Sequence, residues 1–399
     1  MRIHQVLCEA VVACLIEIFE EQQYADKVLE KKLRSNSKWG ARDRAFIAEH
    51  TYDIVRHFRW LQCVYEKPIT STTDWWQLLG LQLLRQGLEL PNLEVWKSLA
   101  AQHWSDLETR CTPVRAVRHS IPDWLDELGQ TELGEDWGAT LHALNLPASV
   151  VLRTNTLKIS RSELQAKLQL EGIETTLVGT VGLVLSSRKN VFQSKAFQAG
   201  WFEVQDASSQ LVAPLLDLQP GQRVVDACAG AGGKTLHIAD LLQNKGSVIA
   251  LDTEAWKLEE LSKRAKRAGV HIIDRRPITS AKTIKRLHES ADRLLLDVPC
   301  SGLGVLKRNP DAKWKLTPEF MERVKTTQQD ILSRYSLMLK PGGKMVYATC
   351  SVLPSENQQQ IAQFLEHTSN RFELLTERAI LPQEAGFDGF YMALLLRKE

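Results

Sequence analysis

Hydrophobic positions in the first third of the chain recur every three or four residues, which is the spacing of helices that bury one face. The segments with this spacing are residues 1–21, 43–60, 75–87, 93–104 and 123–128. In the first of them Glu9 and Glu17 interrupt the apolar run, which is also too short to span a membrane. The pattern therefore predicts an all-helical domain over residues 1–144, with no membrane segment.

The pattern changes near residue 146, where short strand-like runs begin to surround one helical segment. The strand-like runs are VVLRTNTL (150–157), TTLVG (175–179), GLVLSS (182–187) and WFEVQD (201–206), and the helical segment is residues 160–172. This order predicts a small α/β module of the RRM-like kind over residues 145–206. The next segment, residues 208–218, is interpreted as a helix that leads into the last domain.

From residue 221 onward, apolar strand-like runs alternate with helical segments. Strands are predicted at 223–226, 247–251, 270–273, 293–297, 344–349 and 389–397. Helices are predicted at 234–242, 255–268 and 283–289, then from Pro318 behind the capping residue Thr317, and behind a capping box of Ser355 and Gln358. Alternation of this length indicates a doubly wound, mostly parallel sheet in a Rossmann-like α/β domain over residues 207–399.

Composition places the chain among ordinary soluble globular proteins, with 44% hydrophobic and 25% charged residues in 399. The net charge is only +2, so an anionic partner would have to be met by local basic patches. The seven cysteines are scattered and form no CxxC pair, which favours reduced cytosolic thiols over a disulfide framework or a metal site. One basic cluster stands out, and its members are Lys31, Lys32, Arg34, Lys38, Arg42 and Arg44.

The first strand of the last domain is followed by a glycine-rich loop, CAGAGGKT at 228–235. A Walker A loop would need glycine at Cys228, and a dinucleotide fingerprint would need it at Thr235. The spacing Asp226-x-x-x-Gly230-x-Gly232 instead matches S-adenosylmethionine methyltransferases. Asp252 ends the next strand, where a carboxylate can accept both ribose hydroxyls. The predicted cofactor contacts are Cys228, Ala229, Gly230, Ala231, Gly232, Gly233, Lys234, Asp252, Thr279 and Asp297.

Two cysteines follow strands whose carboxyl ends should meet at one edge of the sheet. Cys300 lies three residues beyond Asp297, which ends one strand, and Cys350 lies just past the next strand. Free cysteines are usually buried small hydrophobes, and that interpretation suits Cys14 and Cys63 on apolar helical faces. It does not suit a cysteine in the polar loop PCSG, so thiolate chemistry is the better interpretation of the pair.

Methyl transfer needs a thiolate only when the acceptor is a poor nucleophile, such as C5 of cytosine. Attack of a thiolate at C6 makes C5 nucleophilic, and loss of the C5 proton then expels the thiol. Methylation of nitrogen or oxygen needs no such step. Asp297 is placed to protonate or hydrogen-bond N3 of the base and so to assist the attack.

These segments together resemble the Sun (RsmB-like) family of RNA cytosine-C5 methyltransferases. The segments that carry the resemblance are CAGAGGKT (228–235), DVPCSGLG (297–304), RNPD (308–311), ATCS-x-x-x-x-E-N (348–357), LRTNTL (152–157) and VQDASSQLVAPLL (204–216). The resemblance spans about residues 147–398. It implies that Cys350 attacks the base, that Cys300 assists product release, and that Lys234 and Asp297 lie in the active site. It also implies ribosomal RNA as the substrate and a NusB-like or related RNA-binding domain at the N-terminus.

The chain departs from the family pattern at two places. Gly230-Ala231 replaces the usual Ala-Pro pair of the loop, which restores the general methyltransferase glycine. The third strand of the family usually ends in an aspartate that contacts adenine. Here Thr279 stands at that place and Asp274 lies a few residues earlier, so either residue is a candidate for the contact.

With RNA as the partner, phosphate contacts are expected from residues 31–44, Arg56, Arg59 and the basic loop 307–315. The expected protein is a cytoplasmic, monomeric enzyme. A DNA cytosine-C5 methyltransferase would share the Pro-Cys nucleophile but lack the second cysteine. A non-catalytic RNA-binding or ribosome assembly factor could retain the same fold. Thr279 favours that alternative, and the intact thiols oppose it.

Overall fold

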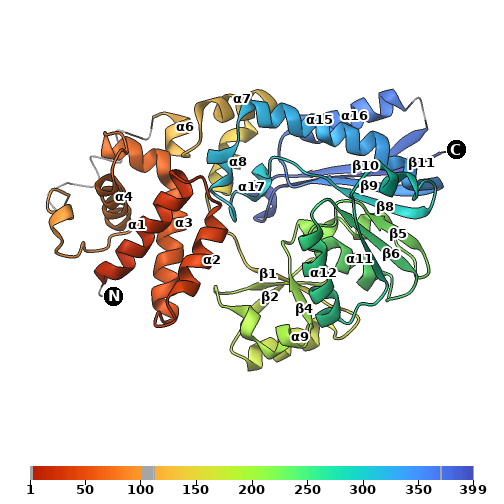
Figure 1. Cartoon of the computed structure of the whole chain (residues 1–399), viewed down its shortest axis with the longest axis horizontal. Helices are drawn as coiled ribbons and strands as arrows, with labels where there is room; N and C mark the ends of the chain where they lie inside the picture. The colour runs from red at the N-terminus through yellow and green to blue at the C-terminus, as the bar shows by residue number, and fades with distance from the viewer. Residues whose placement is uncertain (1–2, 100–110, 112, 369–370, 399) are drawn as a thin grey trace. The chain divides into compact units, whose positions relative to one another are not determined.

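The computed structural model describes residues 3–99, 111, 113–368 and 371–398 (Figure 1). The chain divides into two compact units. The first contains residues 1–146 together with residues 306–318, and the second contains residues 147–305 and 319–399. No helix in the described part of the chain is long and apolar enough to cross a membrane.

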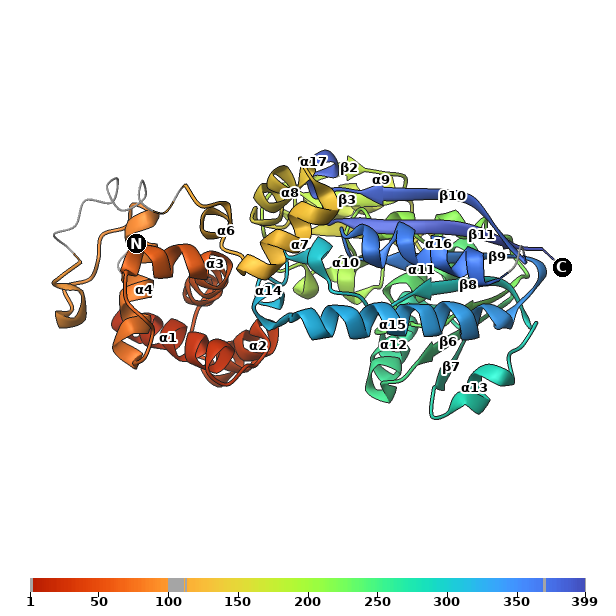
Figure 2. The same cartoon turned by 90° about the horizontal axis from the view of Figure 1, so that it is seen from above.

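The first unit is helical, as predicted (Figure 2). Its helices are α1 (Gln5–Phe19), α2 (Ala25–Ser35), α3 (Ala41–Tyr65), α4 (Thr72–Arg85), α6 (Arg115–Arg118), α7 (Asp123–Leu133), α8 (Asp136–Leu144) and α14 (Ala312–Lys315). Stacked rings of Phe19, Phe58 and Trp75 contribute to its core. The helix predicted at 93–104 is a 3-10 turn at Glu94–Trp96, and its later part lies outside the described residues.

Residues 306–318 belong to the helical unit although the second unit precedes and follows them in sequence. The Asp311 carboxylate accepts the backbone N–H of Ala25 at 3.0 Å, and the Trp314 indole donates to the carbonyl of Val55 at 2.7 Å. The Lys313 ammonium donates to the carbonyl of Arg56 at 2.7 Å. The sequence pattern does not predict this insertion, because its partners lie more than two hundred residues away.

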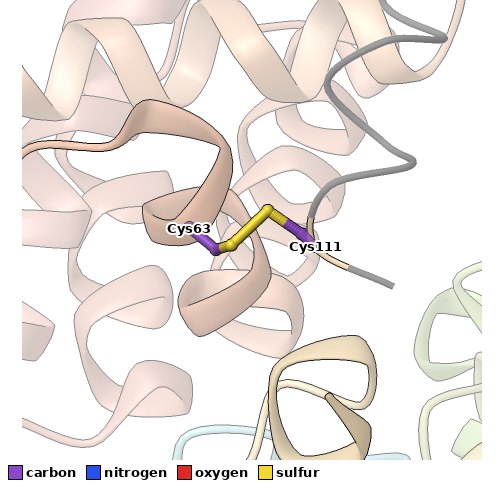
Figure 3. Close-up of a disulfide and its surroundings, with 2 residues drawn as sticks. All are labelled: Cys63 and Cys111. Atoms are coloured by element: carbon purple, nitrogen blue, oxygen red, sulfur yellow. A yellow bond between two sulfur atoms is a disulfide. The ribbon is translucent and has the colours of Figure 1, made fainter. Parts of the chain in front are cut away.

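The expectation of reduced, unpaired cysteines is wrong for one pair in the helical unit (Figure 3). Cys63, near the end of α3, forms a disulfide with Cys111, and their Cα atoms are 6.1 Å apart. The pairing joins residues 48 positions apart, so neither spacing nor periodicity along the chain could indicate it. Cys8, Cys14 and the three cysteines of the second unit are free.

The second unit begins with the small α/β module. Its elements are β1 (Val151–Thr154), α9 (Arg161–Leu170), β2 (Thr175–Val178), β3 (Gly182–Leu185), α10 (Lys195–Gln198) and β4 (Phe202–Val204). The strands form an antiparallel sheet in the order β2-β3-β1-β4, as expected of a small α/β module. The prediction of a helix at residues 208–218 was wrong. Two 3-10 turns, Ser209–Leu211 and Pro214–Leu216, stand there, because Pro214 cannot donate the backbone bond that a continuous helix needs.

A seven-stranded sheet in the order β10-β11-β9-β8-β5-β6-β7 forms the rest of the unit. The strands are β5 (Arg223–Asp226), β6 (Ser247–Asp252), β7 (Ile273–Pro277), β8 (Ala291–Asp297), β9 (Leu339–Thr349), β10 (Phe372–Ile380) and β11 (Phe390–Arg397). β5 to β9 are parallel, while β10 and β11 run antiparallel to their neighbours. The Rossmann-like α/β fold is confirmed, although β10 was not predicted.

Helices cover both faces of this sheet, so it is doubly wound (Figure 1). On one face lie α11 (Gly233–Leu241) and α12 (Ala255–Ala268), and on the other α13 (Ala281–Lys285), α15 (Pro318–Tyr335) and α16 (Gln358–His367). The capping box predicted for α16 was wrong. The N-cap of α16 is Asn357, and Ser355 lies in the preceding 3-10 turn η7 (Pro354–Glu356).

Replacement of Asp311 should test how the inserted segment stabilises the helical unit. Helix α2 has no side-chain cap of its own, since Tyr24 precedes it, and Asp311 accepts its first N–H. We expect Asp311→Ala to lower the free energy of unfolding by about 1–3 kcal/mol, because a buried donor loses its partner. Urea unfolding followed by tryptophan fluorescence measures the change. Asp26→Ala on the exposed face of α2 is the control, and an equal effect of both variants would contradict the capping role.

Candidate active site

The loops after β5, β8 and β9 leave the same edge of the sheet, because these strands are parallel neighbours. The strand register aligns Asp297 with Ala348. The chain therefore leaves β8 and β9 at nearly the same level. This places the sulfurs of Cys300 and Cys350 3.3 Å apart, and both residues are partly exposed. The predicted meeting of the two thiols is present in the structure.

A close backbone approach holds these two loops together. The N–H of Gly304 donates to the carbonyl of Cys350 at 2.9 Å, and the N–H of Gly389 donates to the carbonyl of Gly304 at 2.8 Å. A Cβ atom at position 304 would lie 2.2 Å from the carbonyl oxygen of Gly389, so only glycine fits there. The loop after β8 is thus fixed to β9 and β11 by main-chain atoms.

Lys234 and Asp297 form an ion pair beside the thiols, with 2.7 Å between Nζ and Oδ2. Burial alone would lower the pKa of Lys234, but the charge and hydrogen bond of Asp297 outweigh it and raise that pKa above its ordinary value. The ammonium also lies 5.0 Å from the ring centroid of Phe390. Lys234 therefore stays charged and holds the carboxylate of Asp297 in place.

Asp226, at the end of β5, is buried beneath the glycine loop with 1% of its surface exposed. Its Oδ2 accepts the hydroxyl of Thr235 at 2.7 Å, while its Oδ1 has no hydrogen-bond partner in the described part of the chain. Burial raises the pKa of Asp226 to about 7, and burial likewise raises the pKa of Cys228 above its usual range. In the sequence, Asp226 was only the first residue of a spacing motif. In the structure, its Oδ1 can accept a hydrogen bond from a ligand.

The glycine loop turns sharply at two positions, with φ of 54° at Gly230 and 88° at Gly232. A Cβ atom at Gly232 would lie 2.1 Å from Leu261, so glycine is required there by both conformation and space. The two carboxylate oxygens of Asp252 accept the N–H groups of Gly230 and Glu254, each at 2.8 Å. Asp252, at the end of β6, therefore fixes the shape of the glycine loop that follows β5.

Two arginines from other elements donate hydrogen bonds to backbone carbonyls of the glycine loop. Arg153, on β1 of the small module, donates to the carbonyl of Gly233 at 2.7 Å, and Arg264 on α12 donates to that of Ala231 at 2.7 Å. Arg264 in turn pairs with the buried Glu203 of β4 at 2.9 Å. Sequence reasoning missed these residues, although Arg153 lies within the motif LRTNTL.

The structure separates the two residues considered at the end of the third strand. Pro277 pairs with Asp252 in register, and Thr279 follows two residues later, exposed at the carboxyl edge of the sheet. Asp274 lies three residues before the end of β7, about 10 Å back along the strand. Its carboxylate pairs with Arg276 at 2.6 Å. Of the two, only Thr279 stands at the edge where the other predicted cofactor residues gather.

Part of the predicted basic surface is buried, so the expectation of phosphate contacts there was wrong. Arg56 is 6% exposed and donates to the carbonyls of Leu306 and Lys307, and Lys313 is 2% exposed. Arg59 donates to the carbonyl of Ile121 and pairs with Asp123. A count of charges along the sequence cannot distinguish a basic side chain that holds carbonyls from one that faces solvent. The exposed members of the cluster are Lys31, Arg34, Lys38 and Arg42.

Among the described residues, no group of three or more His, Cys, Asp or Glu side chains could hold a metal ion. The side chains gathered at this edge are two thiols, an ion pair and the carboxylates of Asp226 and Asp252. Such a set can supply a nucleophile, a proton donor or acceptor, and anchors for amine and hydroxyl groups of a ligand.

Comparison with known proteins connects this site to one family. Residues 213–396 match the family model described as "16S rRNA methyltransferase RsmB/F", and residues 121–192 match its ferredoxin-like domain. A probable ribosomal RNA small subunit methyltransferase B of Synechocystis is 32% identical, covering 96% of this chain and 97% of the relative. The corresponding probable enzyme of Bacillus subtilis is 34% identical, with 98% of each chain covered. The crystal structure of a methyltransferase homolog protein from Pyrococcus horikoshii matches with a TM-score of 0.63 and 27% identity, covering 71% of this chain and 97% of that one.

The proximity of the thiols predicts how Cys300 titrates. Its hydrogen bond with Cys350, then burial, then the charges of Cys350 and Glu356 raise the pKa of Cys300 well above that of a free thiol. A raised pKa disfavours the thiolate, so alkylation of Cys300 by iodoacetamide should still rise about tenfold per pH unit at pH 9, without a plateau. Peptide mass spectrometry after timed alkylation measures the rate.

Replacing the partner thiol should accelerate this alkylation. Cys350→Ala removes the hydrogen bond that contributes most to the raised pKa, so Cys300 should react faster at pH 8 than it does in the wild type. Cys228→Ala removes a thiol that makes no hydrogen bond to Cys300 and serves as the control. Equal rates in Cys350→Ala and in the wild type would show that the thiols do not interact.

Proposed function

Because the chain belongs to the RsmB/F family of ribosomal RNA methyltransferases, we propose that it methylates C5 of a cytosine in ribosomal RNA through a covalent cysteine–C6 adduct. That it is an S-adenosylmethionine-dependent RNA methyltransferase follows from the family. The atom that receives the methyl group and the covalent route are the proposal.

The distance of 3.3 Å between the sulfurs of Cys300 and Cys350 is the observation that carries the proposal. Methylation of a nitrogen or an oxygen needs no thiol, whereas C5 of a pyrimidine becomes nucleophilic only after a nucleophile adds to C6. Two partly exposed thiols at the edge that binds the cofactor match this requirement. A DNA-type enzyme would have one such cysteine, so the second favours RNA.

In the proposed sequence of steps the thiolate of Cys350 attacks C6 of the base. S-adenosylmethionine supplies the methyl group that C5 then accepts. Transfer of the C5 proton to a water molecule restores the double bond and breaks the bond between C6 and the sulfur of Cys350, which leaves as a thiolate. The raised pKa of Cys300 keeps its thiol protonated at neutral pH, so it is a poor attacking group but can donate its proton to the departing sulfur of Cys350, 3.3 Å away.

Asp297 is assigned to N3 of the base, where it can donate or accept a hydrogen bond as the ring gains charge. Its carboxylate is partly exposed and is held on one side by Lys234. Because the ion pair fixes its rotamer, the carboxylate is already oriented before the base arrives. Lys234 and Asp297 thus act as one unit next to the thiols.

The residues predicted for the cofactor fit S-adenosylmethionine. The unpartnered Oδ1 of Asp226 suits the amine of the methionine part, and the carboxylate of Asp252 suits the ribose hydroxyls. The backbone of residues 228–234 is open to close approach at its glycines. Thr279 is assigned to the adenine edge.

The exposed basic residues of α2, of the turn after it and of the start of α3 are assigned to RNA phosphates, and we propose that the enzyme acts as a cytoplasmic monomer. The second candidate is a non-catalytic RNA-binding or assembly factor that keeps the fold. It rests on Thr279, which replaces the carboxylate usual in the family. The thiol pair and the ion pair beside it argue for catalysis.

The two thiols should give opposite results when each is replaced. We expect Cys350→Ala to lose turnover and to form no protein–RNA adduct, since the attacking group is absent. Cys300→Ala should still attack and methylate but release product slowly, so an adduct should accumulate. Incubation with unmethylated small-subunit rRNA and labelled S-adenosylmethionine, followed by denaturing gels and nucleoside analysis, measures both effects.

The reverse pattern, with an adduct in Cys350→Ala alone, would exchange the roles of the two cysteines. If the wild type transfers its label to a nitrogen or oxygen of a nucleoside, the covalent route is wrong. Absence of any transfer by the wild type to several rRNA preparations would favour the assembly factor.

The basic residues near α2 should determine the salt dependence of RNA binding. Reversing both Lys38 and Arg42 to Glu should weaken binding and reduce the slope of log K against log salt by about 1 for each lost phosphate contact. Filter binding from 50 to 200 mM salt measures both. Reversal of Lys263 and Lys266, two exposed residues on α12, makes the same change in net charge elsewhere. Equal effects of the two double variants would show that these basic residues only contribute to the overall charge.

A further inference from the structure

The two cysteine loops carry the same tetrapeptide, Cys-Ser-x-Leu, at 300–303 and at 350–353. Both tetrapeptides make the same local turn. The hydroxyl of Ser301 accepts the N–H of Leu303 at 3.3 Å, and the hydroxyl of Ser351 accepts that of Leu353 at 3.2 Å. The loops face each other, since the two hydroxyls are 3.2 Å apart and the two sulfurs 3.3 Å apart.

The carboxylate of Glu356 lies between these two turns and is fully buried, with 0% exposed surface. Its Oε1 accepts the hydroxyls of Ser301, at 2.5 Å, and of Ser351. Its Oε2 accepts the N–H of Ser301 at 2.7 Å and the side-chain amide of Gln328 at 3.1 Å. These four donors fill the four acceptor positions of one carboxylate.

Further hydrogen bonds fix the backbone of Glu356 and the two loops beside it. The hydroxyl of Tyr347 donates to its backbone carbonyl at 2.8 Å. The amide of Gln328 also donates to the carbonyl of Pro299 at 2.9 Å, just before the first cysteine. Asn357 donates to the carbonyl of Ser351 at 3.1 Å, just after the second. The carboxylate is therefore a fixed point between the two loops, bonded through the residue that follows each cysteine.

We propose that Glu356 is a positioning residue that sets the two sulfurs at the distance and orientation needed for attack and release, acting through Ser301 on Cys300 and through Ser351 on Cys350. The proposal rests on the proposed function, because it assigns one step to each loop. Glutamine can keep only part of this set of bonds. With its oxygen toward the two N–H groups that bond Oε2, its NH₂ group would face the two hydroxyls, which would have to accept rather than donate and would lose their bonds to a charged group.

The shared turn allows the two steps to be separated by three variants. Ser351→Ala should slow attack, because the loop of Cys350 loses its bond to Glu356. Ser301→Ala should leave attack intact and slow release, because the loop of Cys300 loses its own bond. Glu356→Gln should slow both steps. A displacement of about 1 Å in a reacting group can cost about a hundredfold in rate, so changes of about ten- to a hundredfold are expected.

Single-turnover reactions with rRNA and S-adenosylmethionine measure these effects, with the adduct followed on denaturing gels over time. The rate of adduct formation reports attack, and the decay of the adduct to methylated RNA reports release. Calorimetric affinity for S-adenosylmethionine should stay within about twofold in all three variants, because the side-chain hydrogen bonds of Glu356 go to Ser301, Ser351 and Gln328, which lie outside the glycine loop. Glu322→Gln, on the exposed side of α15, makes the same chemical change outside the site and should match the wild type.

Attack and release at wild-type rates in Glu356→Gln would overturn the proposal. So would equal losses of both steps in the two serine variants, because a merely structural role would not separate them. If Glu356→Gln fails to fold, the serine variants still decide, since each removes one hydroxyl only. A wild-type enzyme that forms no adduct would overturn the proposed function and the positioning role with it, whereas a normal wild type with unaffected variants overturns the positioning role alone.

Discussion

The parallel pairing of β8 with β9 is the constraint on which the rest of the site depends. Its register aligns Asp297 with Ala348, so the two cysteine loops leave the sheet at nearly the same level. A shift of one residue would turn every side chain of the strand to the opposite face, and Asp297 would lose Lys234. The apolar runs 294–296 and 345–348 are buried on both faces, which specifies this register strongly. Chemistry at the edge is thus fixed by packing within the sheet.

The sequence indicated the core of the fold because buried parallel strands are continuous apolar runs and the helices between them are amphipathic. The prediction failed for the segments whose hydrophobic pattern does not correspond to their structure. β10 is an edge strand with mostly exposed residues, which gives no apolar run. The segment 208–218 is apolar enough for a helix, but Pro214 divides it into two turns. The insertion of residues 306–318 into the helical unit depends on contacts distant in sequence, which no local pattern contains.

For the candidate site too, some residues could be predicted from the sequence and the roles of others appear only in the structure. Cys300, Cys350, Asp297 and Lys234 could be predicted because each lies in a motif at the end of a strand, and the topology brings strand ends together. Glu356 lies in such a motif as well, but its role appears only in its four contacts. Charge was the least informative property. Arg56 and Lys313 were predicted to contact phosphates from their positive charge. In the structure both are buried in the helical unit and donate hydrogen bonds to backbone carbonyls.

The glycine loop is shaped both by its local sequence and by contacts with residues distant in sequence. Proline at position 231 would restrict residue 230 to extended conformations, whereas Gly230 is left-handed with φ of 54°. The pair Gly230-Ala231 therefore permits a turn that the common Ala-Pro pair disfavours, but it removes the rigidity that proline gives. Arg264 and Arg153 hold the loop by bonding the carbonyls of Ala231 and Gly233 from α12 and β1. Because Glu203 of the small module pairs with Arg264, that module also supports the glycine loop. The departure Gly230-Ala231 from the family pattern is therefore compatible with a firmly held loop, and the small module contributes to holding it.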